Sequence, residues 1–219
     1  KKETNFIVAE KSISVSNIAN GTTRLQPVCM LIGQASGALA ALAVKQQSTP
    51  KEVSVRKLQN ELLLAGAFLL PYSDVSISDP GFKALQRIGA TGILKGEGKN
   101  IGWENHTHIY PDKRLRSYEL KEGLKDWLPS QKLNYKNEFV SYGEVLTTII
   151  ELQNIYITTQ KVNRFKPLKR RADHILKKYN LTEFKLTDPL TRATFAILLD
   201  ELLNPFELRA VDHYGNFKH

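Results

Sequence analysis

The chain has 219 residues, of which 42% are hydrophobic and 24% are charged, a composition typical of ordinary globular proteins. Its single cysteine, Cys29, excludes an internal disulfide framework and a zinc site built on cysteines, and we expect it to be a small packed side chain. The net charge of +9 is concentrated in residues 160–178, where eight Lys or Arg accompany one Asp; only Phe165 is aromatic there, so a solvated basic face is expected and no nucleic-acid partner.

The first part of the chain predicts one short strand and several helices. Residues 5–9 (NFIVA) are typical of a buried strand, and residues 28–44 form a long apolar run that predicts a helix. Thr49, Pro50 and Glu52 suit a single helical turn. Ser54 can cap the next helix, which ends at Gly66 and turns one apolar face inward through Val55, Leu58 and Leu62.

The helix over residues 28–44 is apolar on every side yet carries little bulk. Gly33 and Gly37 lie one turn apart among alanines, a spacing that lets another backbone approach closely. A helix that is apolar all round needs partners on every side, and the neighbouring elements are too few to supply them. We therefore expect this segment to be the end of a larger domain, and we expect its apolar surface to be either exposed or buried against the second domain or another copy of the chain. At 17 residues of small side chains, the run is predicted to be too short and too weakly apolar to span a membrane.

Residues 69–80 break the pattern and divide the chain into a first domain, 1–72, and a second, 73–219. In the second, Asp79 and Pro80 start a helix that Gly89 closes, and residues 96–113 read as a loop. Three further helices are predicted, the first ending at Pro129, the second starting with a capping box at Ser141 and Glu144, and the third starting at Thr191. The residues expected in the core are Phe82, Leu85, Ile88, Leu120, Leu124, Trp127, Leu128, Phe195, Leu198, Leu199 and Leu202.

These three helices share one opening, a cap residue followed by a large polar one. The pairs are Ser117-Tyr118, Ser141-Tyr142 and Thr191-Arg192. The pattern indicates either a degenerate internal repeat or a chance similarity of amphipathic helices. The whole chain is therefore predicted to be mainly α, with a minor β remnant.

Residues 5–67 closely resemble the C-terminal end of a family of bacterial FAD-dependent oxidoreductases, some members of which are labelled xanthan lyase. The resemblance rests on four motifs: the pair Ile13-Ser14, the G-T-x-R motif that ends at Arg24, the run P-x-C-M-x-x-G-Q-A-x-G-x-x-A-A-L-A from Pro27, and L-Q-x-x-L over 58–62. It implies that a Rossmann-type N-terminal part of the same chain binds FAD and that this segment completes the flavin site as the C-terminal fragment of an α/β domain.

The resemblance also implies roles for single residues. The helix start would face the flavin pyrimidine ring, with the backbone of Leu25, Gln26, Pro27 and Val28 nearest to it. Glu10 would bind the ribityl hydroxyls, and Arg24 would bind flavin or substrate; the alternatives are a surface acid and a loop anchor. Because the chain has no G-x-G-x-x-G motif after a strand, it lacks a pyrophosphate cradle, and we expect no flavin on these residues alone and no catalytic residue in them.

The second domain resembles an S-layer homology unit. Gly92-Ile93 to Gly96, Pro111-Asp112 and Thr191-Arg192-Ala193 hold the pattern, whereas Thr194 stands where the family has Glu. That family binds acidic cell-wall polysaccharide, which implies an extracytoplasmic location in a bacterium. Our first expectation is a helical packing or interaction scaffold. The alternative is a stand-alone module that binds acidic glycan through Arg192, Tyr118 and Tyr142, with help from Lys169, Arg170 and Arg171.

Two histidines close together, His106 and His108, could offer a metal two ligands. Loop histidines without a third partner are usually solvated, so we predict no metal site.

Overall fold

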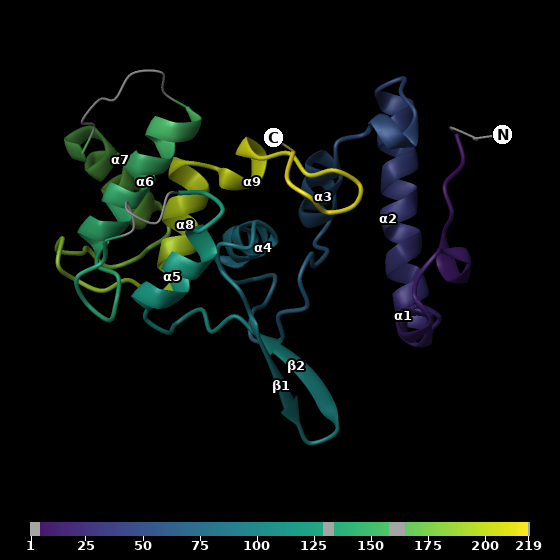
Figure 1. Ribbon diagram of the computed structural model, residues 1–219, viewed down its shortest axis with the longest axis horizontal. Helices are drawn as coiled ribbons and strands as arrows, with labels where there is room; N and C mark the ends of the chain where they lie inside the picture. Colours follow the sequence, from purple (N-terminus) through teal and green to yellow (C-terminus); the bar gives the residue numbers. More distant parts are fainter. Residues whose placement is uncertain (1–4, 129–133, 158–164, 219) are drawn as a thin grey trace. The chain divides into compact units, whose positions relative to one another are not determined.

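The computed structural model describes residues 5–128, 134–157 and 165–218. It is 51% helix and 9% strand, which confirms a mainly α protein with a minor β component. The chain forms two compact units, one built from the residues up to Ala67 together with the stretch from Arg209 onward, and the other from Phe68–Leu208. Figure 1 shows the elements of both.

The first unit is a set of helices around one long one. It contains two single turns, η1 (Glu10–Ser12) and η2 (Pro50–Glu52), and three α-helices, α1 (Asn17–Thr23), α2 (Gln26–Lys45) and α3 (Val55–Leu64). The capping box of Thr49 and Glu52 and the N-cap at Ser54 are confirmed. Gly66, with φ of 78°, ends α3 as predicted.

The predicted strand over residues 5–9 is wrong. These residues have no regular structure, and Phe6 is exposed. A strand needs a neighbour for its N–H and C=O groups, and none of the described residues of this unit provides one.

Helix α2 is largely uncovered, as expected. Its only buried residues are Leu42 and Ala43, which pack with Val53. Met30, Leu31 and Val44 are 76%, 60% and 79% exposed. A Cβ atom added at Gly33 or Gly37 would meet nothing within 4 Å, so the small-residue face of α2 has no partner among the described residues.

The prediction that this segment is too short and too weakly apolar to span a membrane is wrong on both counts. Helix α2 has 20 residues with a mean hydropathy of 1.7 over its best window, which suffices by length and composition. It is longer than expected because Gln26 and Pro27 form its first turn. The core helix of a globular protein passes the same test, so the finding by itself assigns no location.

The second unit is a helical body with one hairpin. Helix α8 (Arg192–Leu202) lies at its centre and contacts α4 (Phe82–Ala90), α6 (Tyr142–Tyr156), α7 (Phe165–Lys178) and α9 (Pro205–Leu208) (Figure 1). Helix α5 (Ser117–Leu124) completes the unit. The predicted core residues are buried, and so are the unpredicted Ile109, Leu115, Val140 and Leu190. Pro129 lies outside the described residues.

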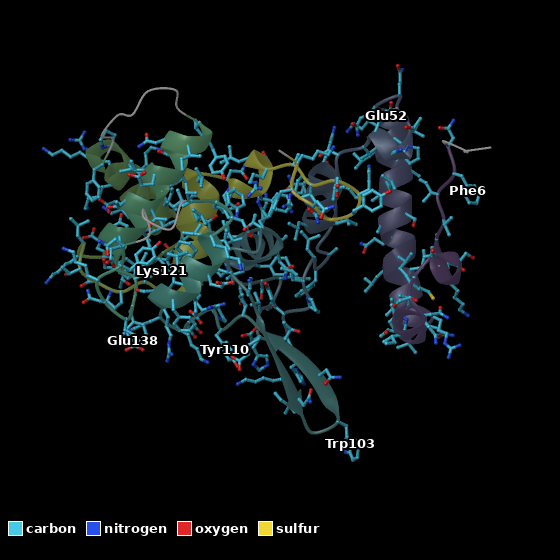
Figure 2. The ribbon with its side chains drawn as sticks, viewed as in Figure 1. Phe6, Glu52, Trp103, Tyr110, Lys121 and Glu138 are labelled. Atoms are coloured by element: carbon cyan, nitrogen blue, oxygen red, sulfur yellow. The ribbon has the colours of Figure 1, made fainter. Side chains whose placement is uncertain are left out.

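Two details of this unit differ from the sequence prediction. The expected loop contains a polar hairpin, β1 (Glu97–Ile101) paired antiparallel with β2 (Glu104–His108), with Trp103 at its tip (Figure 2). Helix α4 passes through Gly89, and the glycine with positive φ that follows the helix is Gly92. Gly89 serves another purpose, because a Cβ there would collide with Tyr72 Oη.

Three segments that lead into α5, α6 and α8 meet in a closed ring. The N–H of Leu115 donates to Leu190 O (2.9 Å), that of Val140 to Leu115 O (2.9 Å) and that of Leu190 to Val140 O (3.1 Å). Isolated β-bridges repeat the cycle: Arg114 with Thr191, Arg116 with Phe139, and Ser141 with Pro189. The three helix starts are therefore related by approximate threefold symmetry.

The ring also corrects the register of the shared opening. The residue before the helix is Arg116 in α5, Ser141 in α6 and Thr191 in α8. Ser117 is thus the first residue of its helix, in the position that Tyr142 and Arg192 hold in theirs. The pair Ser117-Tyr118 predicted from the sequence should therefore read Arg116-Ser117.

Candidate functional sites

The first candidate site is the N-terminal end of α2. Leu25 precedes the helix in an extended conformation (φ −69°, ψ 139°), and no side chain caps the first turn. Pro27, within that turn, has no N–H and a φ that suits a helix. An uncapped helix start presents free N–H donors and a partial positive charge, which favours a ligand group that is or becomes negative.

The residues predicted at this site lie on the exposed surface of the first unit. Arg24, Leu25, Gln26 and Pro27 are exposed and consecutive, and Val28 is half-buried. Glu10 is exposed with φ of 57°, in η1, which packs against α2 as α1 does. The structure thus places Leu25 to Val28 at the start of α2, with Arg24 directly before them, and leaves Glu10 and Arg24 accessible.

Cys29 lies one turn into α2. Its Sγ donates a hydrogen bond to Thr23 O (3.4 Å), and the side chain is half-buried between α1 and α2. It is a small packing group, as expected.

The second candidate site surrounds Arg192 at the start of α8. This side chain is only 6% exposed and its guanidinium is fully engaged within its own unit. Nε donates to Ile109 O (2.7 Å), one terminal nitrogen donates to Lys95 O (2.7 Å), and the other forms an ion pair with Glu119 (3.1 Å). Arg192 therefore joins α8 to α5 and to the residues on either side of the hairpin, Lys95 and Ile109. Little of its charge remains for a ligand.

The two tyrosines predicted beside Arg192 separate. Tyr118 is 63% exposed and lines two adjoining cavities, of about 320 and 280 Å³, that also include Glu97, Glu119 and Arg192. Tyr142 is wholly buried, and its hydroxyl donates to Asp173 (2.8 Å). Burial, and then this hydrogen bond, raise the pKa of Tyr142 well above its usual value. Only Tyr118 can reach a ligand at this place.

The basic residues of α7 do not converge on Arg192. Lys169 forms an ion pair with Asp173 on its own helix (2.7 Å), and Arg170 and Arg171 are exposed. None of the three lines either cavity beside Arg192.

Sequence reasoning missed most of the cavity beside Tyr118. The smaller cavity is lined by a second aromatic ring and several cations that the sequence did not single out: Tyr110, Lys113, Arg114 and Arg116. Lys113 Nζ stands 3.3 Å from the centre of the Tyr110 ring. The one available signal was the basic run K-R-L-R that follows Pro111-Asp112.

His106 and His108 lie on β2 and touch edge to face, with ring centres 5.8 Å apart. His106 Nε2 and a carboxylate oxygen of Glu104 lie 2.9 Å apart, within hydrogen-bonding distance. No group of three metal-ligating side chains occurs among the residues that the structure describes.

The protein is helical and has two units, and in the first unit the glycine face of α2 meets none of the residues that the structure describes. In a comparison with family profiles, residues 1–62 match the family described as FAD dependent oxidoreductase. No match was found among curated proteins or among solved structures.

Proposed function

We propose that the first unit belongs to the flavin-binding domain of a bacterial FAD-dependent oxidoreductase, related to the members labelled xanthan lyase, and completes the flavin site there. The family match of residues 1–62 supports this assignment. The observation that carries it is the bare face of α2, because a helix with Gly33 and Gly37 in open space is shaped for close contact with another backbone.

The residues around the start of α2 fit such a cofactor. FAD supplies hydride and electron transfer when it is bound. The uncapped first turn, from Leu25 to Val28, presents N–H groups and the positive helix end to the ring edge that gains negative charge on reduction. Arg24 adds a cation at the same end, and Glu10 offers a carboxylate to sugar hydroxyls. The pyrophosphate cradle comes from the preceding Rossmann-type part, so the described residues retain no flavin by themselves.

The test is a comparison of the full-length protein with a variant at the helix start. Full-length protein should purify with bound FAD, and Arg24→Gln should lower its flavin content or affinity. Lys57→Gln is the matched control, since Lys57 is an exposed cation on α3, away from the start of α2. A full-length protein without flavin, or equal effects of both substitutions, contradicts the proposal.

For the second unit we propose a packing or interaction scaffold of the S-layer-homology type, without a free glycan site at Arg192. The closed ring of Leu115, Val140 and Leu190 supports a rigid three-part body. Arg192, which a glycan site would need as a free cation, is engaged by Glu119 and two carbonyl groups. Tyr142 is buried at the equivalent position of the ring.

One observation favours the alternative, a module that binds acidic cell-wall glycan. The exposed Tyr118 adjoins a cavity with Lys113, Arg114 and Arg116, a combination in which a ring can stack on a sugar and cations attract carboxylates. Purified wall polysaccharide at low salt decides between the two. Retention of the wild-type protein that Tyr118→Ala abolishes and Tyr214→Ala leaves intact would establish glycan binding; no retention supports the scaffold.

A further inference from the structure

The stretch from Arg209 to Lys218, which is part of the first unit, folds back on itself. Val211 and Phe217 form a β-bridge, and the N–H of Lys218 donates to Ala210 O (2.8 Å). The Asp212 carboxylate closes the turn by accepting from the N–H groups of Tyr214 (2.8 Å) and Asn216 (2.9 Å). The guanidinium of Arg209 lies 4.1 Å from the centre of the Phe217 ring. This stretch is therefore an ordered turn, which we call the clasp (209–218).

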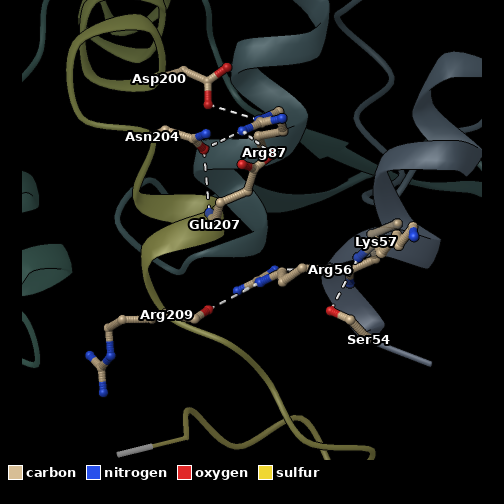
Figure 3. A network of polar contacts seen from close by, with 9 residues as sticks. Ser54, Arg56, Lys57, Arg87, Asp200, Asn204, Glu207 and Arg209 are labelled. Carbon is tan, nitrogen blue, oxygen red and sulfur yellow. Dashed lines mark hydrogen bonds and ion pairs between the residues drawn. The ribbon is translucent and has the colours of Figure 1, made fainter. Parts of the chain in front are cut away.

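The clasp is tied to the part of the first unit that follows α2. His213 Nε2 and Lys51 O are 2.6 Å apart, and Arg56 Nε donates to Arg209 O (3.5 Å; Figure 3). Arg56 is buried and also donates to Gln59 Oε1 (2.9 Å). Val53, between these two anchor points, packs on Leu42 and Ala43 of α2. The clasp thus holds the segment that fixes the C-terminal end of α2.

Both ends of the second unit pack on the same helix of that unit. At its beginning, Phe68 meets Phe82 at the start of α4 edge to face, with ring centres 4.9 Å apart. At its end, Phe206 lies under the guanidinium of Arg87 in the same helix, 4.8 Å from ring centre to Cζ, and Glu207 forms an ion pair with Arg87 (3.6 Å). A body whose two ends pack on one helix can be inserted into another domain with little strain.

We propose that the helical unit 68–208 is inserted into the oxidoreductase domain, not appended to it, and that the clasp is a further element of that domain. Resting on the proposed family assignment of residues 1–62, the inference gives the clasp a positioning role: it secures η2 and α3, and through Val53 it secures α2. The chain then passes between the oxidoreductase domain and the helical unit twice, after Ala67 and before Arg209.

Hydrogen exchange of the whole chain, followed by mass spectrometry, tests this inference. In His213→Ala/Phe217→Ala, amides of residues 50–64 and of the C-terminal turn of α2 should exchange about tenfold faster, since the hydrogen bond to Lys51 and the ring contact with Arg209 are lost. Tyr214→Ala is the matched control, because this tyrosine lies in the same turn and is 91% exposed. Amides of α6 and α8 should be unchanged in both variants and show that the second unit stays folded.

Two results would overturn the inference. One is unchanged exchange of residues 50–64 in the double variant. The other is wild-type amides of Gly215, Asn216 and Lys218 that exchange as fast as those of an unstructured peptide. Neither readout involves flavin, so failure of the clasp leaves the flavin assignment standing, and a flavin-free full-length protein leaves the clasp contact standing.

Discussion

Alanine in place of Gly33 and Gly37 should stabilise this chain. Alanine is favoured over glycine in a helix interior by about 1 kcal/mol. Nothing within 4 Å would touch the added Cβ at either position, so no steric cost offsets the gain. The double variant should therefore gain about 2 kcal/mol against local opening of α2, a factor of roughly 30 in the opening equilibrium.

The assay is hydrogen exchange of peptides from residues 26–45 in Gly33→Ala, Gly37→Ala and the double variant. Gly89→Ala is the matched control in helix α4, where a Cβ would collide with Tyr72 Oη; it should destabilise the second unit by about 1–3 kcal/mol. Under the proposed function, the preceding part of the full-length protein covers this face, and the sign at Gly33 and Gly37 should reverse there. Faster exchange of α2 in the double variant of this chain would refute the argument that its glycine face is bare.

Three further predictions concern the second unit. Burial raises the pKa of Asp200 to about 6, although the attraction of Arg87 opposes the rise. Because the folded state then holds this proton more tightly than the unfolded state does, the free energy of unfolding should fall as the pH rises from about 4 to 6. Asp200→Asn should flatten that slope in denaturant titrations. Arg192→Ala should lower the free energy of unfolding by about 3 kcal/mol or more, because Glu119 loses its ion-pair partner and two carbonyl groups lose a hydrogen bond. An effect below about 1 kcal/mol would contradict the conclusion that Arg192 holds α8 to α5. Thr191→Ala should cost about 1 kcal/mol through loss of the N-cap of α8, which accepts from the N–H of Thr194, whereas Thr187→Ala, on an exposed loop, should be neutral in the same titration.

Helices of the second unit could be predicted because their signals are local. Ser141 and Glu144 form a capping box within four residues, and Phe195, Leu198, Leu199 and Leu202 repeat at the helical period. The hairpin gave no such signal, because its strands, EGKNI and ENHTH, are polar on both faces and mostly exposed. The strand expected at Phe6 failed for the opposite reason: its apolar pattern is strong, but a strand depends on a partner that the described residues do not contain.

The candidate sites also differ in whether their signals are local in the sequence. The start of α2 could be predicted to within two residues, since Pro27 and the small-residue run mark it in the sequence, although the helix begins at Gln26 and not at Val28. The surroundings of Arg192 could not, because its three partners, Lys95, Ile109 and Glu119, lie far from it in the chain and meet it only through the ring at Leu115, Val140 and Leu190. The clasp was missed as well, since it depends on contacts between residues more than 150 positions apart.

The measurement that tests the central claim most directly is reconstitution of the flavin site from two pieces. The preceding Rossmann-type part that the proposal requires is produced separately and mixed with this 219-residue chain, and FAD binding is followed by quenching of flavin fluorescence. Tight binding should appear only in the mixture and should weaken when the mixture carries Gly33→Ala/Gly37→Ala. Equally tight binding by either piece alone, or no gain on mixing, would contradict the claim that the start of α2 completes the site.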